Sequence, residues 1–388
     1  MRAIDASAID TSALVDWLIG GAPDCVPPQD VLRKLSEGLL AAGVPVSRNS
    51  VFVLTHHPQI AGRRFAWRRG APMEVSELKY EMIETSGYTD SPVNYVFEKN
   101  SELRRRLGHA DCPLDFPILK ELREQGITDY FGTPLRFTFG EVHGATWATD
   151  ELGGFSDAHI AAIRSIVAPL ARVAEIRALT RTSSALLDTY VGHKTGERVR
   201  AGHIRRGDTE AIRAAIWLSD MRGFTALSDR ETPQTILDVL NRYFDCQVPT
   251  ILAHGGEVLK FMGDGLLAIF PVTDEISPDR ACAEALAGAR EARAQVAAVE
   301  GMRFGLALHL GEVLYGNIGS GNRLDFTCIG PAVNLAARLE KVASQLGRSI
   351  VASREFARRI PQELVPLGDF TLAGFQAPQP AFGLPDAL

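Results

Sequence analysis

Hydrophobic and polar residues follow different spacings along this chain, and each spacing predicts a type of element. Up to about residue 155, helical periodicity mixes with short apolar or alternating runs. These runs predict helices over residues 32–40 and 117–125 and strands over residues 50–55, 63–68, 130–139 and 144–149. Gly126 follows the second helix, where glycine commonly ends a helix.

A longer helical stripe begins after Ser156, which is placed to cap its first turn, and Asp157 adds a favourable charge there. Apolar residues then recur at Ile160, Ile163, Val167, Leu170 and Val173. Pro169 interrupts the stripe, so we expect a kink in a helix that continues toward Leu187. Residues 188–210 are polar and contain glycines, which favours a connector.

The pattern changes at residue 211, where an apolar run predicts a strand. There follow a predicted amphipathic helix over 232–252, two strands over 256–271 joined by a turn at 263–265, a helix over 279–299, a strand over 302–310 and a helix over 331–345. This β–α–β–β–α–β order predicts an α+β fold of the ferredoxin-like kind.

Composition narrows the class of protein. The 388 residues suggest two or three domains, and 46% hydrophobic with 23% charged residues is typical of a globular chain. The net charge of −6 lacks the basic surplus of nucleic-acid binders, and no apolar run approaches the roughly 18 residues of a membrane span. The acidic N-terminus predicts no signal peptide. Five scattered cysteines without Cys-x-x-Cys favour a reducing, cytoplasmic location over a disulfide framework.

Two pairs of polar residues are candidates for chemistry. Asp220 ends an apolar strand and Asp264 lies between two glycines at a hairpin tip, so together they could hold a hard cation such as Mg²⁺. Taken singly, either aspartate is better explained as ordinary turn chemistry. Asn334 and Arg338 share one helix face, where arginine suits charge on a phosphoryl group, although a solvated face is the simpler explanation.

Four sequence motifs, occurring in a fixed order, favour a chemical role for these residues over the simpler explanations. They read LSDMRGFTALS, GGEVLKFMGDGLLAIF, FGLALHLGEVLYGNIGS and DFTCIGPAVNLAARLE. Residues 211 to about 385 thereby resemble the catalytic domain of class III nucleotidyl cyclases, the adenylate and guanylate cyclase family. The resemblance implies ATP or GTP as substrate, with attack of the ribose 3′-oxygen on the α-phosphorus and release of pyrophosphate.

The resemblance also implies roles for individual residues. Asp220, Asp264 and the Met221 backbone match the family's site for two Mg²⁺ or Mn²⁺ ions. The backbone of residues 221–225, with Gly223, Phe224 and Thr225, matches the segment that contacts the phosphates. Asn334 matches the residue that orients the ribose, and Arg338 matches the one that stabilises the transition state. In this family two subunits share each site, which implies a homodimer with two equivalent sites.

The position of Lys260 matches the purine-reading lysine of adenylate cyclases, where guanylate cyclases usually have glutamate. Its partner position is Thr327, and a bacterial subset of adenylate cyclases pairs lysine with threonine in this way. Cys328 is one residue away from the cysteine position of guanylate cyclases, so we interpret it as a core residue. The simpler alternatives are a surface lysine and an ordinary strand threonine, and guanylate cyclase activity remains the less favoured alternative.

Two departures from the family pattern bear on activity. Ala373 replaces a lysine that contacts the triphosphate, a loss of roughly 1.5–3 kcal/mol of binding. Arg323 is one basic residue that could substitute for it. Pro331 replaces a frequent acidic residue, and we expect no catalytic cost from that change. A weak or catalytically silent nucleotide-binding regulator is therefore the alternative to an active enzyme.

Residues from about 10 to 180 resemble a GAF-type sensory domain, an α/β sandwich, on the segments SVFVLT, GATWATD and GFSDAHIAAIRSIVAPLARVAEI. Such a domain encloses a small-ligand pocket or mediates dimerisation. Pocket-lining candidates, for which core packing is the alternative, are Trp67, Tyr88, Tyr95, Tyr130 and Trp147. His56 and His57 could be metal or haem ligands, or more simply polar loop residues. We expect a sensory domain over 1–180, a signalling helix and linker over 181–210, and a cyclase domain over 211–388.

Overall fold

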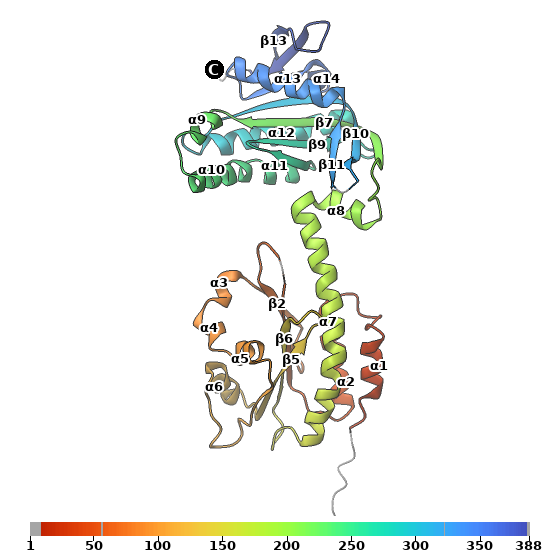
Figure 1. The fold of residues 1–388 in the computed structure, drawn as a ribbon, viewed down its shortest axis with the longest axis vertical. Helices are drawn as coiled ribbons and strands as arrows, with labels where there is room; N and C mark the ends of the chain where they lie inside the picture. Colours follow the sequence, from red (N-terminus) through yellow and green to blue (C-terminus); the bar gives the residue numbers. More distant parts are fainter. Residues whose placement is uncertain (1–8, 56, 322, 386–388) are drawn as a thin grey trace, which may run out of the picture. The chain divides into compact units, whose positions relative to one another are not determined.

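The computed structural model describes residues 9–55, 57–321 and 323–385 and divides into two compact units, Met1–Leu186 and Leu187–Leu388 (Figure 1). We call these the N-terminal unit and the C-terminal unit and describe each separately. None of the helices described is long and apolar enough to cross a bilayer.

The N-terminal unit is built on one six-stranded antiparallel sheet in the order β3-β2-β1-β6-β5-β4. The strands are β1 (Arg48–Leu54), β2 (Gly62–Arg68), β3 (Glu74–Leu78), β4 (Leu103–Arg105), β5 (Asp129–Arg136) and β6 (Val142–Thr149). Four of these strands confirm the strand predictions for this region. β3 and β4 were not among the predicted strands; both are short and form the two edges of the sheet.

Helices cover both faces of this sheet, as Figure 1 shows. On one side are α1 (Ser12–Ile19), α2 (Pro28–Ala41) and α7 (Asp157–Val191), and on the other α3 (Tyr80–Ile83), α4 (Ser86–Thr89), α5 (Pro92–Lys99) and α6 (Pro117–Glu124). The main core lies under α2 and α7, where Leu35, Trp147 and Ile163 are fully buried. A second cluster, with Leu119 and Leu122 at its centre, lies under α5 and α6.

The long helix α7 begins as predicted, because the Ser156 hydroxyl accepts a hydrogen bond from the His159 N–H at 3.2 Å. Pro169 lies inside its 35 residues. The expected connector over 188–210 is partly wrong as local structure: α7 continues to Val191, and α8 (His193–Arg200) follows after Gly192. Gly192 has a φ of 85°, which a residue with a side chain rarely adopts, so it separates the two helices.

The C-terminal unit contains an eight-stranded sheet in the order β13-β14-β12-β10-β7-β9-β8, with β11 paired to β10. The strands are β7 (Thr209–Met221), β8 (Glu257–Met262), β9 (Gly265–Pro271), β10 (Phe304–Ser320), β11 (Arg323–Ile329), β12 (Ile350–Ser353), β13 (Val365–Phe370) and β14 (Gln379–Gly383). The inner order β10-β7-β9-β8, with helices between β7 and β8 and between β9 and β10, confirms the predicted βαββαβ arrangement.

Helices also cover both faces of this second sheet (Figure 1). They are α9 (Phe224–Ser228), α10 (Pro233–Asp245), α11 (Val248–Ala253), α12 (Pro278–Ala297), α13 (Pro331–Gln345) and α14 (Arg354–Ala357). Side chains of β7 alternate between the two cores: Trp217 packs in the core with α12, and Ile216 packs in the core with α13. Because Asp220 follows the alternation of Ile216, it lies on the α13 side of the sheet.

Two elements of this unit have boundaries that differ from those predicted. The single helix expected over 232–252 is two helices, α10 and α11, separated at Cys246 and Gln247. Pro249 explains the break, since its ring has no N–H to donate and clashes with the carbonyl four residues earlier. The strand expected over 302–310 continues to Ser320, because β10 pairs with β7 first and then also with β11.

Candidate active site

The two aspartates singled out from the sequence lie together at one end of the sheet. Asp220 is near the end of β7, in register with Gly265 of β9. Asp264 lies in the turn between β8 and β9, and its carbonyl accepts a hydrogen bond from the Met221 N–H at 3.3 Å. Gly263 has a φ of 68°, which lets the chain reverse directly before Asp264. The hairpin thus places the second acid beside the first.

The electrostatics of this acid pair are unfavourable without a cation. Burial raises the pKa of Asp220 to about 6, and the neighbouring Asp264 carboxylate is the next cause of that shift. The Arg222 guanidinium lowers the pKa only weakly, because it forms an ion pair of 2.7 Å with Glu340, whose own charge acts in the opposite direction. Two hard carboxylates with uncompensated charge fit a divalent cation such as Mg²⁺ or Mn²⁺.

The acid pair supplies only part of a metal's coordination shell. Within the described residues, no group of three or more His, Cys, Asp or Glu side chains could hold a metal ion. A cation bound by Asp220 and Asp264 would therefore complete its shell with backbone carbonyls, water or phosphate oxygens. One candidate for a backbone ligand is the carbonyl of Met221, the residue that directly follows Asp220.

The loop after β7 presents backbone N–H groups beside the acid pair. Gly223 adopts a left-handed conformation with φ 80° and precedes α9, and nothing lies within 4 Å of where its Cβ would be. The first N–H groups of a helix have no intrahelical acceptor, which applies here to Phe224 and Thr225. This loop can therefore face an anion placed next to Asp220.

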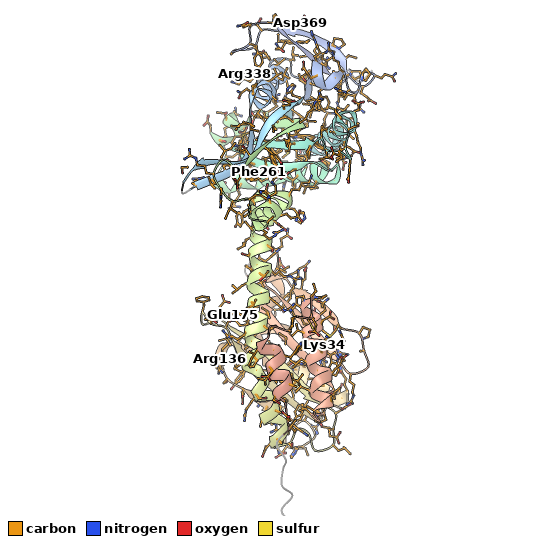
Figure 2. The ribbon with its side chains drawn as sticks, turned by 90° about the vertical axis from the view of Figure 1, so that its right-hand side faces the viewer. Lys34, Arg136, Glu175, Phe261, Arg338 and Asp369 are labelled. Carbon is orange, nitrogen blue, oxygen red and sulfur yellow. The ribbon has the colours of Figure 1, made fainter. Side chains whose placement is uncertain are left out.

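Asn334 and Arg338 lie on the outer side of α13, whereas Ala336 and Leu339 pack against the sheet. Figure 2 shows Arg338 on this helix. Through the whole described chain, no hydrogen bond or ion pair joins either side chain to the acid pair, and no carboxylate holds the Arg338 guanidinium. The fold of one chain therefore leaves these two side chains free to meet a separate group.

Lys260 lies on β8, and its Nζ is 3.4 Å from Oδ2 of Asp325 on β11, with side chains 33% and 60% exposed. Thr327 lies two residues further along β11, so it shares a strand face with Asp325. The Thr327 hydroxyl is buried and has no hydrogen-bond partner among the residues described. The structure thus places Lys260 beside Asp325, which the sequence analysis missed, and shows no hydrogen bond between Lys260 and Thr327.

The other residues of interest lie as follows. Cys328 is buried in the core under α13, and burial raises the pKa of its thiol to about 11, which confirms its interpretation as a core residue. Ala373 is exposed in a turn where the Phe375 N–H donates to the Leu372 carbonyl at 3.1 Å. Pro331 is the first residue of α13. Arg323 is exposed at the start of β11.

In the N-terminal unit the aromatic candidates divide between core and cavity. Trp67 and Trp147 are buried in the main core. Tyr88 and Tyr130 line a cavity of about 540 Å³ between the sheet and α3–α5. His56 lies outside the described residues, and Nδ1 of His57 accepts a hydrogen bond from the Gln59 N–H.

Comparison with known proteins finds a family match for most of the C-terminal unit. Residues 209–367 match the family described as "Adenylate and Guanylate cyclase catalytic domain". This stretch includes the acid pair, Lys260 and the polar face of α13. Residues 209–367 are thus similar to the cyclase catalytic domain of that family.

Individual relatives are similar at modest identity. The chain is 27% identical to adenylate cyclase 1 of Rhizobium meliloti (strain 1021) over 218 residues. The aligned region covers 53% of this chain and 32% of that protein. The chain is 31% identical to the adenylate cyclase of Anabaena cylindrica over 169 residues. This aligned region covers 41% of this chain and 33% of the Anabaena protein. The crystal structure of the adenylyl cyclase CyaB from P. aeruginosa is similar with a TM-score of 0.40 and 26% identity, over 46% of this chain and 97% of that chain. The chain thus spans about a third of the length of these two curated relatives.

Proposed function

We propose that this protein is an adenylate cyclase that converts ATP to 3′,5′-cyclic AMP and pyrophosphate. The observation that carries the proposal is the Asp220–Asp264 pair, half-buried, mutually repelling and placed within a cyclase catalytic domain. The relatives from Rhizobium meliloti and Anabaena cylindrica, which bear the name adenylate cyclase, support the choice of nucleotide.

Each residue of the site contributes a separate task. Asp220 and Asp264, with the Met221 carbonyl, would hold two Mg²⁺ or Mn²⁺ ions, and these ions would supply positive charge for the triphosphate and for deprotonation of the ribose 3′-hydroxyl. The N–H groups of residues 223–225 donate to phosphate oxygens. Asn334 orients the ribose so that its 3′-oxygen faces the α-phosphorus. Arg338 donates to the oxygens on which charge develops as the new P–O bond forms and the bond to pyrophosphate breaks.

We propose that the site is shared between two copies of the chain. Within one chain no hydrogen bond or ion pair of the described residues links Arg338 to the acid pair, and a single domain carries both sets. A two-fold axis would then bring the acids of one copy to the α13 of the other, which makes two equivalent sites. Mixing Asp220→Asn with Arg338→Ala should restore activity, because one site of the mixed dimer is intact, whereas no recovery would contradict a shared site.

Adenine is the base that Lys260 favours, with Thr327 as its partner position, as in the lysine–threonine subset of bacterial adenylate cyclases. The Thr327 hydroxyl has no hydrogen-bond partner among the described residues, so no other protein group holds it. Guanylate cyclase activity is the alternative, and a product assay with both nucleotides distinguishes the two.

The N-terminal unit is proposed to be a GAF-like sensory domain over residues 1–180 that regulates the cyclase through the segment 181–210. The helix–sheet–helix layering and the cavity of about 540 Å³ support a small-molecule ligand. Deletion of residues 1–190 should change turnover or dimerisation, and no change in either would refute the regulatory role.

The test of the proposed activity is product identification by mass spectrometry after incubation with ATP or GTP and Mn²⁺. We expect cyclic AMP from ATP only, and its loss in Asp220→Asn. A folded dimer that binds ATP without forming any cyclic product would instead favour a silent regulator, for which Ala373 is the sequence support.

A further inference from the structure

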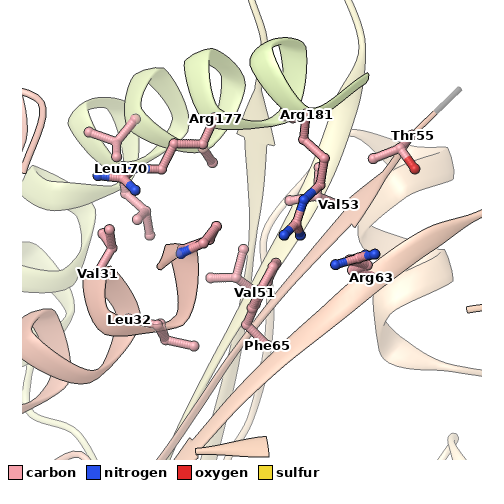
Figure 3. A pocket seen from close by; sticks show the side chains of 14 residues that line it. Val31, Leu32, Val51, Val53, Thr55, Arg63, Phe65, Leu170, Arg177 and Arg181 are labelled. Carbon is pink, nitrogen blue, oxygen red and sulfur yellow. The ribbon is translucent and has the colours of Figure 1, made fainter. Parts of the chain in front are cut away.

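A small apolar cavity lies within the N-terminal unit, on the opposite face of the sheet from the cavity near Tyr88. It is lined by α2, α7 and the strands β1 and β2, and Figure 3 shows it from close by. Its volume is about 70 Å³, and its walls are almost entirely hydrocarbon. The floor is formed by Val31, Leu32, Val51, Val53, Phe65 and Leu170.

Two guanidinium groups lie at one end of this apolar cavity. Arg63 comes from β2 and Arg181 from α7, and Figure 3 shows their side chains reaching toward one another. Burial lowers the pKa of Arg181, and the positive charge of Arg63 lowers it further. The Glu77 carboxylate acts on Arg181 in the opposite direction, but one carboxylate balances only one of the two guanidinium charges.

The protein supplies only one carboxylate to this pair. Arg63 donates to Glu77 at 2.7 Å, but its Nε is buried without a hydrogen-bond partner. In the chain as described, no ion pair or hydrogen bond holds Arg181. A third arginine at the cavity, Arg177, is already committed, because it donates to the carbonyls of Val26 and Ala22 at 3.1 and 3.2 Å. The geometry therefore leaves donors for an external anion at Arg63 and Arg181 only.

The size of the cavity limits the apolar part of the ligand. One water needs roughly 10–15 Å³ on this measure, so the cavity of about 70 Å³ holds roughly five to seven non-hydrogen atoms. A free phosphate would leave the hydrocarbon floor uncovered, and a bulky aromatic nucleotide would not enter. A short hydrocarbon tail fits the floor, and a carboxylate at its end reaches both guanidiniums.

We propose that this cavity binds a short-chain carboxylate, whose tail of about five carbon atoms covers the floor and whose carboxylate bridges Arg63 and Arg181. The ligand contacts α7, the helix that continues to Val191. The site is separate from the cavity of about 540 Å³ and does not depend on the proposed cyclase activity.

The neighbour of Arg63 offers a matched control. Arg64 lies on the same strand and points to the opposite face, where it lines the larger cavity. Each arginine pairs with a glutamate of β3, and their side chains are 24% and 23% exposed. Arg63→Gln and Arg64→Gln thus remove the same charge and a similar ion pair from the two faces.

The test is calorimetric titration of the full chain with sodium hexanoate, sodium acetate and hexanamide. We expect hexanoate to bind at least about tenfold more tightly than acetate, which lacks the tail, and than hexanamide, which lacks the charge. Arg63→Gln and Arg181→Gln should each weaken hexanoate binding about tenfold or more, and Arg64→Gln should leave it unchanged. Ala174→Phe, which fills the cavity, should abolish binding while thermal unfolding shows a folded chain.

Three outcomes would overturn the assignment. The first is no heat of binding with millimolar hexanoate. The second is equal affinity for hexanoate and hexanamide. The third is loss of binding in Arg64→Gln with retention in Arg63→Gln, which would place the ligand in the larger cavity. All three are independent of cyclic nucleotide formation, so failure here leaves the proposed function untouched.

Discussion

Two aspartates, one in each unit, show how differently a buried carboxylate can be used. Asp129 begins β5 in the N-terminal unit and is completely buried, with Arg104 at 2.7 Å and the Phe155 N–H at 3.0 Å. Asp220 lies near the end of β7 in the C-terminal unit, beside a second acid. The first carboxylate is satisfied by the protein itself, and the second requires something that the protein does not supply.

The partners of a buried carboxylate, rather than how deeply it is buried, distinguish the structural acid from the functional one. Asp129 is the more deeply buried of the two, yet its oxygens are matched by donors that hold the start of β5 to the segment before α7. At Asp220 the carboxyl group is forced next to another acid, a pattern common at functional sites. Removing the charge of Asp129 should therefore lower the stability of the fold, and removing the charge of Asp220 should raise it.

The largest expected effect is on catalysis. Asp220→Asn should reduce the rate of cyclic nucleotide formation on the order of 10³-fold or more, because one of the two ligands for the metal charge is lost. The rate is measured with Mn²⁺ and saturating ATP. Asp274→Asn, an exposed aspartate of the same unit, is the control. A loss of less than tenfold in Asp220→Asn would mean that the acid pair is not the metal site.

The next largest effect is on the stability of the N-terminal unit. Asp129→Asn should lower its free energy of unfolding by about 3–5 kcal/mol, because Arg104 would keep a partly buried charge without its partner. Urea unfolding followed by tryptophan fluorescence measures this. Asp115→Asn breaks the ion pair with Arg105, in which the carboxylate is 40% exposed instead of fully buried, so water can replace it and the cost should be about 1 kcal/mol. An equal loss of unfolding free energy in the two variants would show that the Asp129 carboxylate is no more important for the fold than that of Asp115.

Base selectivity should change by a smaller amount. Lys260→Glu should lower the preference for ATP over GTP by about tenfold, or about 1.4 kcal/mol, since a donor at the purine edge becomes an acceptor. The quantity to measure is the ratio of kcat/KM for the two nucleotides. Asp325→Asn, which removes the Lys260 partner but keeps the lysine, should change this ratio little. An unchanged ratio in Lys260→Glu would show that the lysine does not read the base.

The smallest effect is a pH-dependent gain in stability. The native pKa of Asp220 is about 6 against 3.8 for an unperturbed carboxyl, so the native state binds the proton more tightly and stability rises as pH falls from above 6 toward 4. Two pKa units correspond to about 3 kcal/mol, and solvent screening of this half-exposed group reduces that to roughly 1 kcal/mol.

Asp220→Asn should therefore raise the unfolding temperature at pH 8 by roughly 2–4 °C without divalent ions, and by nothing at pH 4. Differential scanning fluorimetry at both pH values measures the difference. A variant less stable than the native protein at pH 8 would contradict the repulsion between Asp220 and Asp264.

Much of the site could be predicted because its parts are local. The apolar run that becomes β7 and the Gly-Asp-Gly turn each carry an aspartate at a strand end, which is a local pattern. That the two strand ends meet depends on the long-range pairing of β7 with β9. The helix of Asn334 and Arg338 was equally clear from its periodicity. Short-range patterns of this kind need no knowledge of the tertiary fold.

What the sequence did not reveal depends on distant contacts. Arg222 and Glu340 are 118 residues apart, and neither has a local pattern that indicates an ion pair. Asp325 became visible as the neighbour of Lys260 only once β11 lay near β8. The only local sign that Arg222 lies near the site is its place in the chain, two residues after Asp220. The helix break before Pro249 could have been predicted from the proline itself.

The most direct test of the acid pair is Mn²⁺ binding measured by electron paramagnetic resonance without nucleotide. The native chain should bind Mn²⁺ with an affinity that falls as the pH is lowered through about 6, where Asp220 becomes protonated. Asp220→Asn and Asp264→Asn should each lose this binding, and Asp274→Asn should keep it. Mn²⁺ affinity that is the same in Asp220→Asn as in the native chain would contradict the assignment of these two aspartates as a metal site.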